Sequence, residues 1–248
     1  MTTHRFFVSP DCLKNGVVTF PSETEHQLRR VLRLQAGQQV IVLDNLGNEF
    51  EVVLRADAAS VLRGEVLASR RAEGEPQVRL ILYLCLSQRE KFEWMLQKCT
   101  EVGAAGFVPV ISSRSLVQDA KAVEKKVLRW QKIIQEAAEQ CERGRIPTLE
   151  AAMPFAKAVQ AATSADVAII PWTGETAHSL KQALVDLPTE GGTIAAMIGP
   201  EGGFSDDEAA AARDAGMQPV TLGKRILRME TAAVVTAAVV MQVLGEMG

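Results

Sequence analysis

The pattern of apolar and polar positions changes near residue 70. Before it come short runs typical of strands, at residues 17–20, 39–44, 49–55 and 61–68. A helix is predicted to begin at Ser22, because Glu25 three residues later completes a capping-box pattern. The Asn45–Asn48 stretch between two strands is typical of a hairpin turn. Strands packed this densely, with a single helix, predict a small β-barrel.

Beyond the charged, turn-rich stretch at residues 70–76, strand and helix patterns alternate to the end of the chain. A domain boundary is expected there, separating residues 1–72 from residues 73–248. The predicted strands are 78–86, 106–111, 167–170, 193–198 and 219–222. The predicted helices are 90–102, one that carries the apolar positions from Val123 to Cys141, 177–187, 206–215 and 230–244. Such alternation predicts an α/β domain with a parallel sheet covered on both faces.

One glycine-rich segment follows the predicted strand 193–198. It reads Gly199-Pro-Glu-Gly-Gly203, and Ser205 with Glu208 then forms a second capping-box pattern. Glycines at the carboxyl end of a parallel strand bring backbone close to a ligand, here an adenosine or a carboxylate. The spacing differs from the G-x-G-x-x-G of dinucleotide-binding dehydrogenases, and Pro200 removes a donor, which disfavours a nucleotide-dependent oxidoreductase.

A second segment joins the predicted strand 219–222 to the last, almost wholly apolar helix. It carries Lys224, Arg225 and Arg228 beside Gly223. Cations concentrated at a turn are costly unless they face solvent, Glu230 or an anionic partner. A third strand ends similarly, at residues 171–174. We expect the three strand ends to converge on one pocket.

Composition limits the classes of protein. The net charge is −3 and the sequence pI about 5.8, which excludes a uniformly basic chain. Residues 1–75 carry −1, residues 76–146 carry +4 and residues 147–248 carry −6, so the total conceals a local excess of positive charge. The four cysteines form no C-x-x-C and the three histidines are scattered, so no metal site is expected. With no signal peptide and no apolar run long enough to span a membrane, we expect a cytoplasmic protein.

Several segments together resemble a bacterial family of the SPOUT class, the knotted methyltransferases that methylate N3 of a uridine in 16S ribosomal RNA. The matching segments are His26–Leu34, Glu93–Val102, Ser112–Leu116, Arg129–Trp130, Glu136–Gln140, Ile198–Ser205 and Leu222–Ala232. Gln27 stands where that family often has a second histidine. Cys141-Glu142 precedes Arg143, so either Arg143 or Arg145 corresponds to the arginine of that family.

The resemblance implies an N-terminal PUA-like β-barrel for RNA and a C-terminal SPOUT α/β domain with a deep trefoil knot. It also implies a homodimer that binds S-adenosylmethionine in the knot loops and acts on a specific uridine in the decoding region of the small ribosomal subunit. The implied cofactor contacts are Trp172, Ile198, Gly199, Glu201, Gly202, Leu222, Gly223, Ile226, Leu227 and Met229. The apolar helix 230–244 fits burial in a core or in a subunit interface equally well.

Methylating N3 of uracil requires negative charge to develop on the ring and a proton to leave. We expect Arg228 to stabilise that charge, with Arg114, Arg143 and Arg145 as alternatives, and Glu201 to pair with the sulfonium side of the cofactor or with an arginine. The predicted RNA contacts are Arg5, Arg29, Arg30, Arg33, Arg143, Arg145, Lys224 and Arg225. An alternative is a non-catalytic RNA-binding or ribosome-assembly protein with a vestigial cofactor pocket.

Overall fold

A computed structural model describes residues 4–56, 62–119, 123–185, 187 and 191–247 of the chain. The chain forms two compact units. Unit 1 consists of residues 1–75 and 138–146, and unit 2 of residues 76–137 and 147–248. The second segment of unit 1 has no counterpart in the predicted domain bounds 1–72 and 73–248. Its presence follows from burial of Ala138 with Phe7, Ile41 and Leu43, which lie far away in the sequence.

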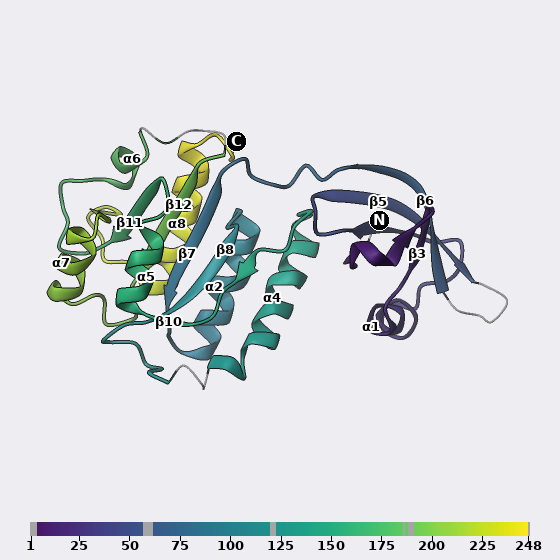
Figure 1. Cartoon of the computed structure of the whole chain (residues 1–248), viewed down its shortest axis with the longest axis horizontal. Coiled ribbons are helices and arrows are strands. Elements are labelled where there is room, and N and C mark those ends of the chain that lie inside the picture. The colour runs from purple at the N-terminus through teal and green to yellow at the C-terminus, as the bar shows by residue number, and fades with distance from the viewer. Residues whose placement is uncertain (1–3, 57–61, 120–122, 186, 188–190, 248) are drawn as a thin grey trace. The chain divides into compact units, whose positions relative to one another are not determined.

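Unit 1 is built on a curled sheet of short and long strands (Figure 1). The strands are β1 (Arg5–Phe7), β2 (Leu13–Lys14), β3 (Val17–Thr19), β4 (Gln39–Leu43), β5 (Asn48–Ala56) and β6 (Leu62–Arg71). Their order is β1-β4-β5-β6-β3-β2; β1 pairs with β4 in parallel and the other pairs are antiparallel. The hairpin predicted at residues 45–48 is confirmed as the β4–β5 turn. Asp44 Oδ1 holds this turn by accepting hydrogen bonds from the amides of Leu46 and Asn48.

The helical part of unit 1 comprises a 3-10 turn η1 (Pro10–Cys12), α1 (Ser22–His26) and a π-helical turn η2 (Gln27–Val31). The capping box predicted at Ser22 is wrong, because Pro21 is the N-cap and no side chain caps the helix. Glu25 instead accepts a hydrogen bond from the amide of Leu62 and pairs with Arg29. Val61, the first residue of the strand predicted at 61–68, lies outside the described residues.

Strand β4 is buried on both faces. Val40 and Val42 pack in one apolar cluster of unit 1, which is centred on Leu28, whereas Ile41 and Leu43 pack in a second cluster with Ala138. Alternation of apolar and polar residues marks a strand with one solvated face. The continuous apolar run of β4 therefore reflects the covering of its second face by residues 138–146.

Unit 2 contains the predicted parallel sheet, which is confirmed. Its strands are β7 (Arg79–Cys85), β8 (Gly106–Ile111), β9 (Thr148–Leu149), β10 (Met153–Pro154), β11 (Val167–Pro171), β12 (Thr193–Ile198) and β13 (Gln218–Val220). The order is β10-β8-β7-β12-β11-β13, with β9 beside β8, and every recorded pair is parallel. Because the strands are parallel, the carboxyl ends of β11, β12 and β13 lie at one edge.

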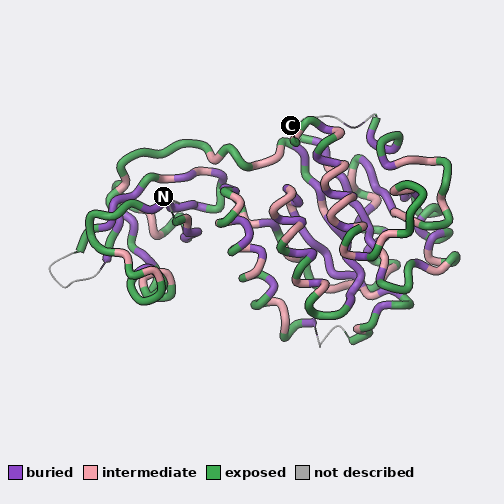
Figure 2. Tube along the Cα trace, turned by 180° about the vertical axis from the view of Figure 1, so that it is seen from behind, coloured by how far each residue is buried: buried purple, intermediate pink, exposed green. Residues whose placement is uncertain are grey.

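Helices cover both faces of this sheet (Figure 1). They are α2 (Arg89–Val102), α4 (Val127–Gln140), α5 (Phe155–Ala162), α6 (Leu180–Ala183), α7 (Asp206–Asp214) and α8 (Met229–Val243). Helix α8 packs on α2 and α6 and against β7 and β12, whereas α5 contacts β8, β10 and β12. The central strands of the sheet are buried along their length, as expected between two layers of helices (Figure 2). Helix α6 is much shorter than the predicted 177–187, and α5 was not predicted.

Candidate functional site

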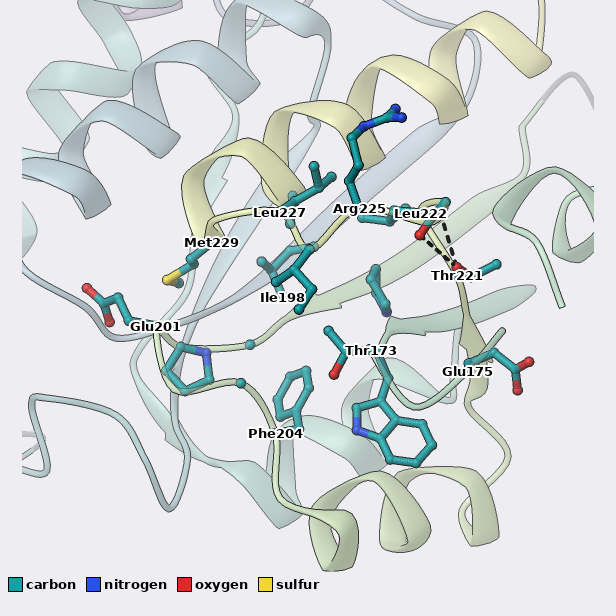
Figure 3. Close-up of a pocket in the computed structure, with 18 of the residues that line it drawn as sticks. Thr173, Glu175, Ile198, Glu201, Phe204, Thr221, Leu222, Arg225, Leu227 and Met229 are labelled. Carbon is teal, nitrogen blue, oxygen red and sulfur yellow. Dashed lines mark hydrogen bonds between the residues drawn. The ribbon is translucent and has the colours of Figure 1, made fainter. Parts of the chain in front are cut away.

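Three loops at the carboxyl ends of β11, β12 and β13 surround a cavity of about 480 Å³ in unit 2 (Figure 3). This volume falls within the ~300–1,000 Å³ usual for small-molecule sites. The lining residues are Pro171, Trp172, Thr173, Glu175, Thr176, Ile198, Gly199, Pro200, Glu201, Gly202, Gly203, Phe204, Thr221, Leu222, Gly223, Lys224, Arg225, Ile226, Leu227, Met229 and Ala232. The predicted convergence of the three strand ends is therefore found in the structure.

The glycine loop after β12 is a tight turn. The amide of Gly203 donates to the carbonyl of Pro200 at 2.9 Å, and Gly203 has φ +66°, a conformation that favours glycine. A Cβ on Gly199 would meet the ring of Phe204 at 3.1 Å. The predicted capping box is confirmed: Ser205 caps α7, and the Glu208 carboxylate accepts a hydrogen bond from the Ser205 amide. The glycines of this loop thus line the cavity with backbone, next to Pro200, Glu201 and Phe204.

The loop after β13 turns at Gly223, which has φ +104°. The hydroxyl of Thr221 accepts a hydrogen bond from the Gly223 amide at 3.1 Å. Beyond this turn Lys224 and Arg225 are exposed, and Figure 3 shows Arg225 projecting from the turn away from Phe204. The loop therefore lines the cavity with apolar residues and also places two exposed cations, Lys224 and Arg225, at its rim.

The loop after β11 supplies an aromatic wall. Trp172 lines the cavity, and Arg213 of α7 lies 5.9 Å from its ring centroid in a cation–π arrangement. A Cβ on Gly174 would overlap the indole, so glycine is required for this ring position. The pKa of Glu175 lies below its ordinary value, because its carboxylate accepts hydrogen bonds from the amides of His178 and Ala177. Glu175 therefore stabilises its own loop.

A neighbouring loop, which follows β8, holds the glycine loop from outside. The Arg114 guanidinium donates to the carbonyl of Gly202 at 2.9 Å, and the amide of Ser113 donates to Glu208 at 2.8 Å. Glu208 thus ties the start of α7 to the loop after β8. No sequence pattern indicated this contact; the only signal was that both segments carry the family resemblance.

Glu201 lies at the edge of the cavity, and its carboxylate is turned away from Phe204 (Figure 3). Lys91 Nζ and the amide of Gln88 lie 3.4 Å from Glu201 Oε1. The partner of Glu201 in this structure is therefore a lysine, where the sequence favoured a sulfonium or an arginine.

The predicted cofactor contacts from Trp172 to Met229 all line the cavity. The predicted catalytic cation Arg228 does not line it, although its neighbours Leu227 and Met229 do. Arg228 is exposed at the N-cap position of α8 and forms no ion pair with another described residue. It therefore stands beside the cavity, where a second ligand would approach.

The arginines predicted to bind RNA in unit 1 divide into two groups. Arg5 pairs with Glu49 and Glu142, and its side chain is 10% exposed. Arg143 is 3% exposed and pairs with Glu75. These two guanidinium groups serve the folding of unit 1, because carboxylates of the same unit already hold them.

The remaining arginines predicted to bind RNA in unit 1 are exposed: Arg29, Arg30, Arg33 and Arg145. Arg29 pairs with Glu25, and Arg145 donates to the carbonyl of Leu46. Arg33 has φ +55°, uncommon for a side chain other than glycine. Arg30, Arg33 and Arg145 are therefore the cations of this group that form no ion pair with another described residue.

The described residues contain no group of three or more His, Cys, Asp or Glu side chains able to hold a metal ion. Cys85 and Cys99 are buried, and burial raises the pKa of each thiol to about 12. Cys12 and Cys141 are half-buried, and neither forms a disulfide with another described residue. Among the helices in the described ranges, none is long and apolar enough to cross a bilayer.

Comparison with known proteins connects this site to a family. Residues 74–241 match the model of an RNA methyltransferase domain. The chain is 33% identical over 237 residues to Ribosomal RNA small subunit methyltransferase E of Synechocystis sp., covering 95% of this chain and 76% of that protein. It is 30% identical to the protein of the same name from Bacillus subtilis, covering 85% and 84%.

Two solved structures have the same fold as this chain over nearly its whole length. The structure of a Ribosomal RNA small subunit methyltransferase E from Neisseria gonorrhoeae bound to S-adenosylmethionine matches with a TM-score of 0.85 and 29% identity, covering 97% of this chain and 98% of that one. A Legionella pneumophila protein in complex with the same cofactor matches with a TM-score of 0.86 and 27% identity, covering 98% of each chain.

Proposed function

The chain belongs to the RNA methyltransferase family, and from this premise we propose that it methylates N3 of a specific uridine in 16S ribosomal RNA, in the decoding region of the small subunit, with S-adenosylmethionine as methyl donor. The observation that carries the proposal is the cavity at the carboxyl edge of β11, β12 and β13, where the loop that carries Trp172, the glycine loop and the loop that turns at Gly223 converge. Open α/β sheets bind small ligands at this kind of edge.

The residues around the cavity fit this cofactor. An adenosine needs apolar surface and backbone hydrogen-bonding groups, and the lining offers both, with Ile198, Leu222 and Leu227 beside the glycine loop. We assign cofactor binding to Trp172, Ile198, Gly199, Glu201, Gly202, Leu222, Gly223, Leu227 and Met229. When bound, S-adenosylmethionine supplies a methyl group on a positively charged sulfur.

The chain must make uracil N3 reactive. Loss of the N3 proton spreads negative charge over N3, O2 and O4, and N3 would then take the methyl group as the bond between that carbon and the donor sulfur breaks, leaving the neutral thioether S-adenosylhomocysteine. We assign to Arg228 the stabilisation of that charge, because it is exposed, unpaired among the described residues and next to cavity-lining residues. Arg114 is already bound to the Gly202 carbonyl, so a role in positioning the glycine loop fits it better. The proton leaves to a carboxylate or to solvent.

The larger architecture belongs to the same proposal. We assign RNA binding to unit 1 as a PUA-like barrel, through Arg29, Arg30, Arg33 and Arg145, and methyl transfer to unit 2 as a SPOUT domain. After β13, at one end of the sheet, the chain returns to α8, which contacts β7, β12 and α6. This return past the strand ends supports a trefoil knot, and the half-buried apolar residues of α8 support a homodimer.

Calorimetry tests the cofactor. We expect the chain to bind S-adenosylmethionine and not NAD, because the glycine loop lacks the dehydrogenase spacing. Binding of NAD without binding of S-adenosylmethionine contradicts the proposal.

Mass spectrometry of 16S ribosomal RNA tests the reaction. A strain that lacks the gene should carry an unmethylated uridine at one position, and the wild-type gene should restore N3-methyluridine there. A uridine that stays methylated in the deletion strain favours the non-catalytic RNA-binding alternative.

A further inference from the structure

The loop that follows Gly223 carries a second feature besides its cavity-lining face. Ile226 is 86% exposed, whereas its neighbour Leu227 is only half exposed. Full burial of an isoleucine side chain contributes ~1.5–3 kcal/mol. A single exposed apolar residue is ordinary, so its surroundings must decide whether Ile226 has a partner.

The surroundings of Ile226 are cationic. Lys224, Arg225 and Arg228 lie within two residues of it, all three are exposed, and none forms an ion pair with another described residue. The nearest carboxylate along the chain, Glu230, is half-buried, and no recorded ion pair joins it to these three described cations. A polyanion such as RNA satisfies cations arranged in this way. The occupant of this surface should therefore combine phosphates with an apolar face.

The proposed reaction, on which this inference rests, requires such an occupant. N3 lies on the Watson–Crick edge of uracil, so the uridine must leave its stack before it can react. Its departure leaves a gap between the neighbouring bases. Proteins that unstack RNA or DNA bases insert apolar side chains such as Ile, Leu or Phe between them.

We propose that Ile226 is a wedge that enters the gap left by the extruded uridine, while Lys224 and Arg225 contact the flanking phosphates. Ile226 then acts on extraction of the target nucleotide, not on cofactor binding or on the transfer itself. Ile226 also lines the cavity, as the family resemblance implied for a cofactor contact, but at 86% exposure most of its side chain stays available to RNA.

The test compares two RNAs that contain the target uridine between the same neighbours, one in a base-paired hairpin and one in an unstructured oligonucleotide. Ile226→Ala should lower kcat/KM on the hairpin on the order of tenfold, since unstacking costs a few kcal/mol. On the unstructured RNA the loss should stay within about threefold, because no stack has to be opened. Ile226→Leu should restore most activity on the hairpin. Val185→Ala, at a 72% exposed apolar position outside the cavity lining, is the matched control.

Two further measurements separate the other roles of Ile226. Calorimetry should show unchanged affinity for S-adenosylmethionine, and analytical ultracentrifugation should show an unchanged oligomeric state. A loss of cofactor affinity, a shift toward monomer, or equal losses on the two RNAs would each overturn the wedge. Wild-type protein that methylates neither these RNAs nor small ribosomal subunits isolated from a strain that lacks the gene refutes the proposed function itself, an outcome distinct from failure of the wedge alone.

Discussion

Two groups of arginines, one in each unit, are alike in sequence and opposite in environment. In unit 1, Arg5 and Arg143 are almost fully buried and are held by carboxylates. In unit 2, Arg225 and Arg228 are exposed and have no carboxylate partner among the described residues. The sequence predicted Arg5, Arg143 and Arg225 as RNA contacts and Arg228 as the cation that stabilises charge on the uracil. The difference shows that the partner of an arginine, more than its presence, separates a structural cation from one available to a ligand.

The largest effect is expected for Arg228. Arg228→Ala should lower kcat by ~10²–10³, the usual loss when one group that stabilises developing charge is removed. Its affinity for S-adenosylmethionine should stay within a few fold, because Arg228 does not line the cavity. Single-turnover methylation together with calorimetry measures the two quantities separately. Equal losses of turnover and cofactor affinity would refute the catalytic role.

Substitution of Arg143 should lower stability and leave ligand binding unchanged. Arg143→Ala leaves the Glu75 carboxylate without its buried partner, so the free energy of unfolding of unit 1 should fall by ~3 kcal/mol. Urea unfolding followed by circular dichroism measures the change. RNA affinity of the folded protein should be unchanged.

Arg30→Ala is the matched control for Arg143→Ala. Arg30 is exposed and has no ion pair with another described residue, so stability should change by no more than about 0.5 kcal/mol. RNA affinity should fall, and the dependence of log K on log[salt] should decrease in slope by ~1, as expected for a lost phosphate contact. If Arg143→Ala weakens RNA binding and Arg30→Ala does not, the division between the two groups is wrong.

A third prediction concerns Arg114, an exposed arginine whose hydrogen bond is to a backbone carbonyl. Arg114→Ala should weaken binding of S-adenosylmethionine by about tenfold, because the Gly202 carbonyl loses its charged donor and the glycine loop loosens. Arg114→Lys should restore part of that affinity. Calorimetry and kcat at saturating cofactor distinguish this positioning role from a catalytic one. Unchanged affinity with a large fall in kcat would instead place Arg114 beside Arg228 in catalysis.

Local patterns predicted much of unit 2. The strands at 193–198 and 106–111 are short, continuous apolar runs, and the capping box at Ser205 joins residues three apart, so pattern analysis detects both. Helix α5 was not predicted, because its N-cap is Pro154 and no side-chain capping pattern marks its start. The glycine loop and the loop with Lys224 and Arg225 could be recognised in the sequence because each directly follows an apolar run that predicts a strand.

Long-range contacts account for what the sequence did not predict. The carboxylates that hold Arg5 lie 44 and 137 residues away, and no local pattern places them there. The burial of both faces of β4 likewise depends on residues 138–146, a segment that sequence order assigns to the other domain. The orientation of Arg114 toward Gly202 spans 88 residues. The sequence therefore identified candidate binding residues, and the structure shows which of them are already held by distant residues.

The smallest expected effect concerns pH and sharpens the same contrast. Burial alone raises the pKa of Glu49, but the hydrogen bonds and charges of Arg5 and Arg70 outweigh it, so the pKa lies below the ordinary value of 4.5. Because the folded-state pKa is the lower one, the stabilisation is present above pH 4.5 and is lost as the pH falls through the folded-state pKa. Glu49→Gln should therefore unfold with a shallower dependence on pH below 4.5 than the wild type, measured by acid titration of the circular dichroism of unit 1. An identical acid profile in the two proteins would mean that Glu49 does not hold Arg5 in solution, and would leave Glu142 as the carboxylate recorded to hold it.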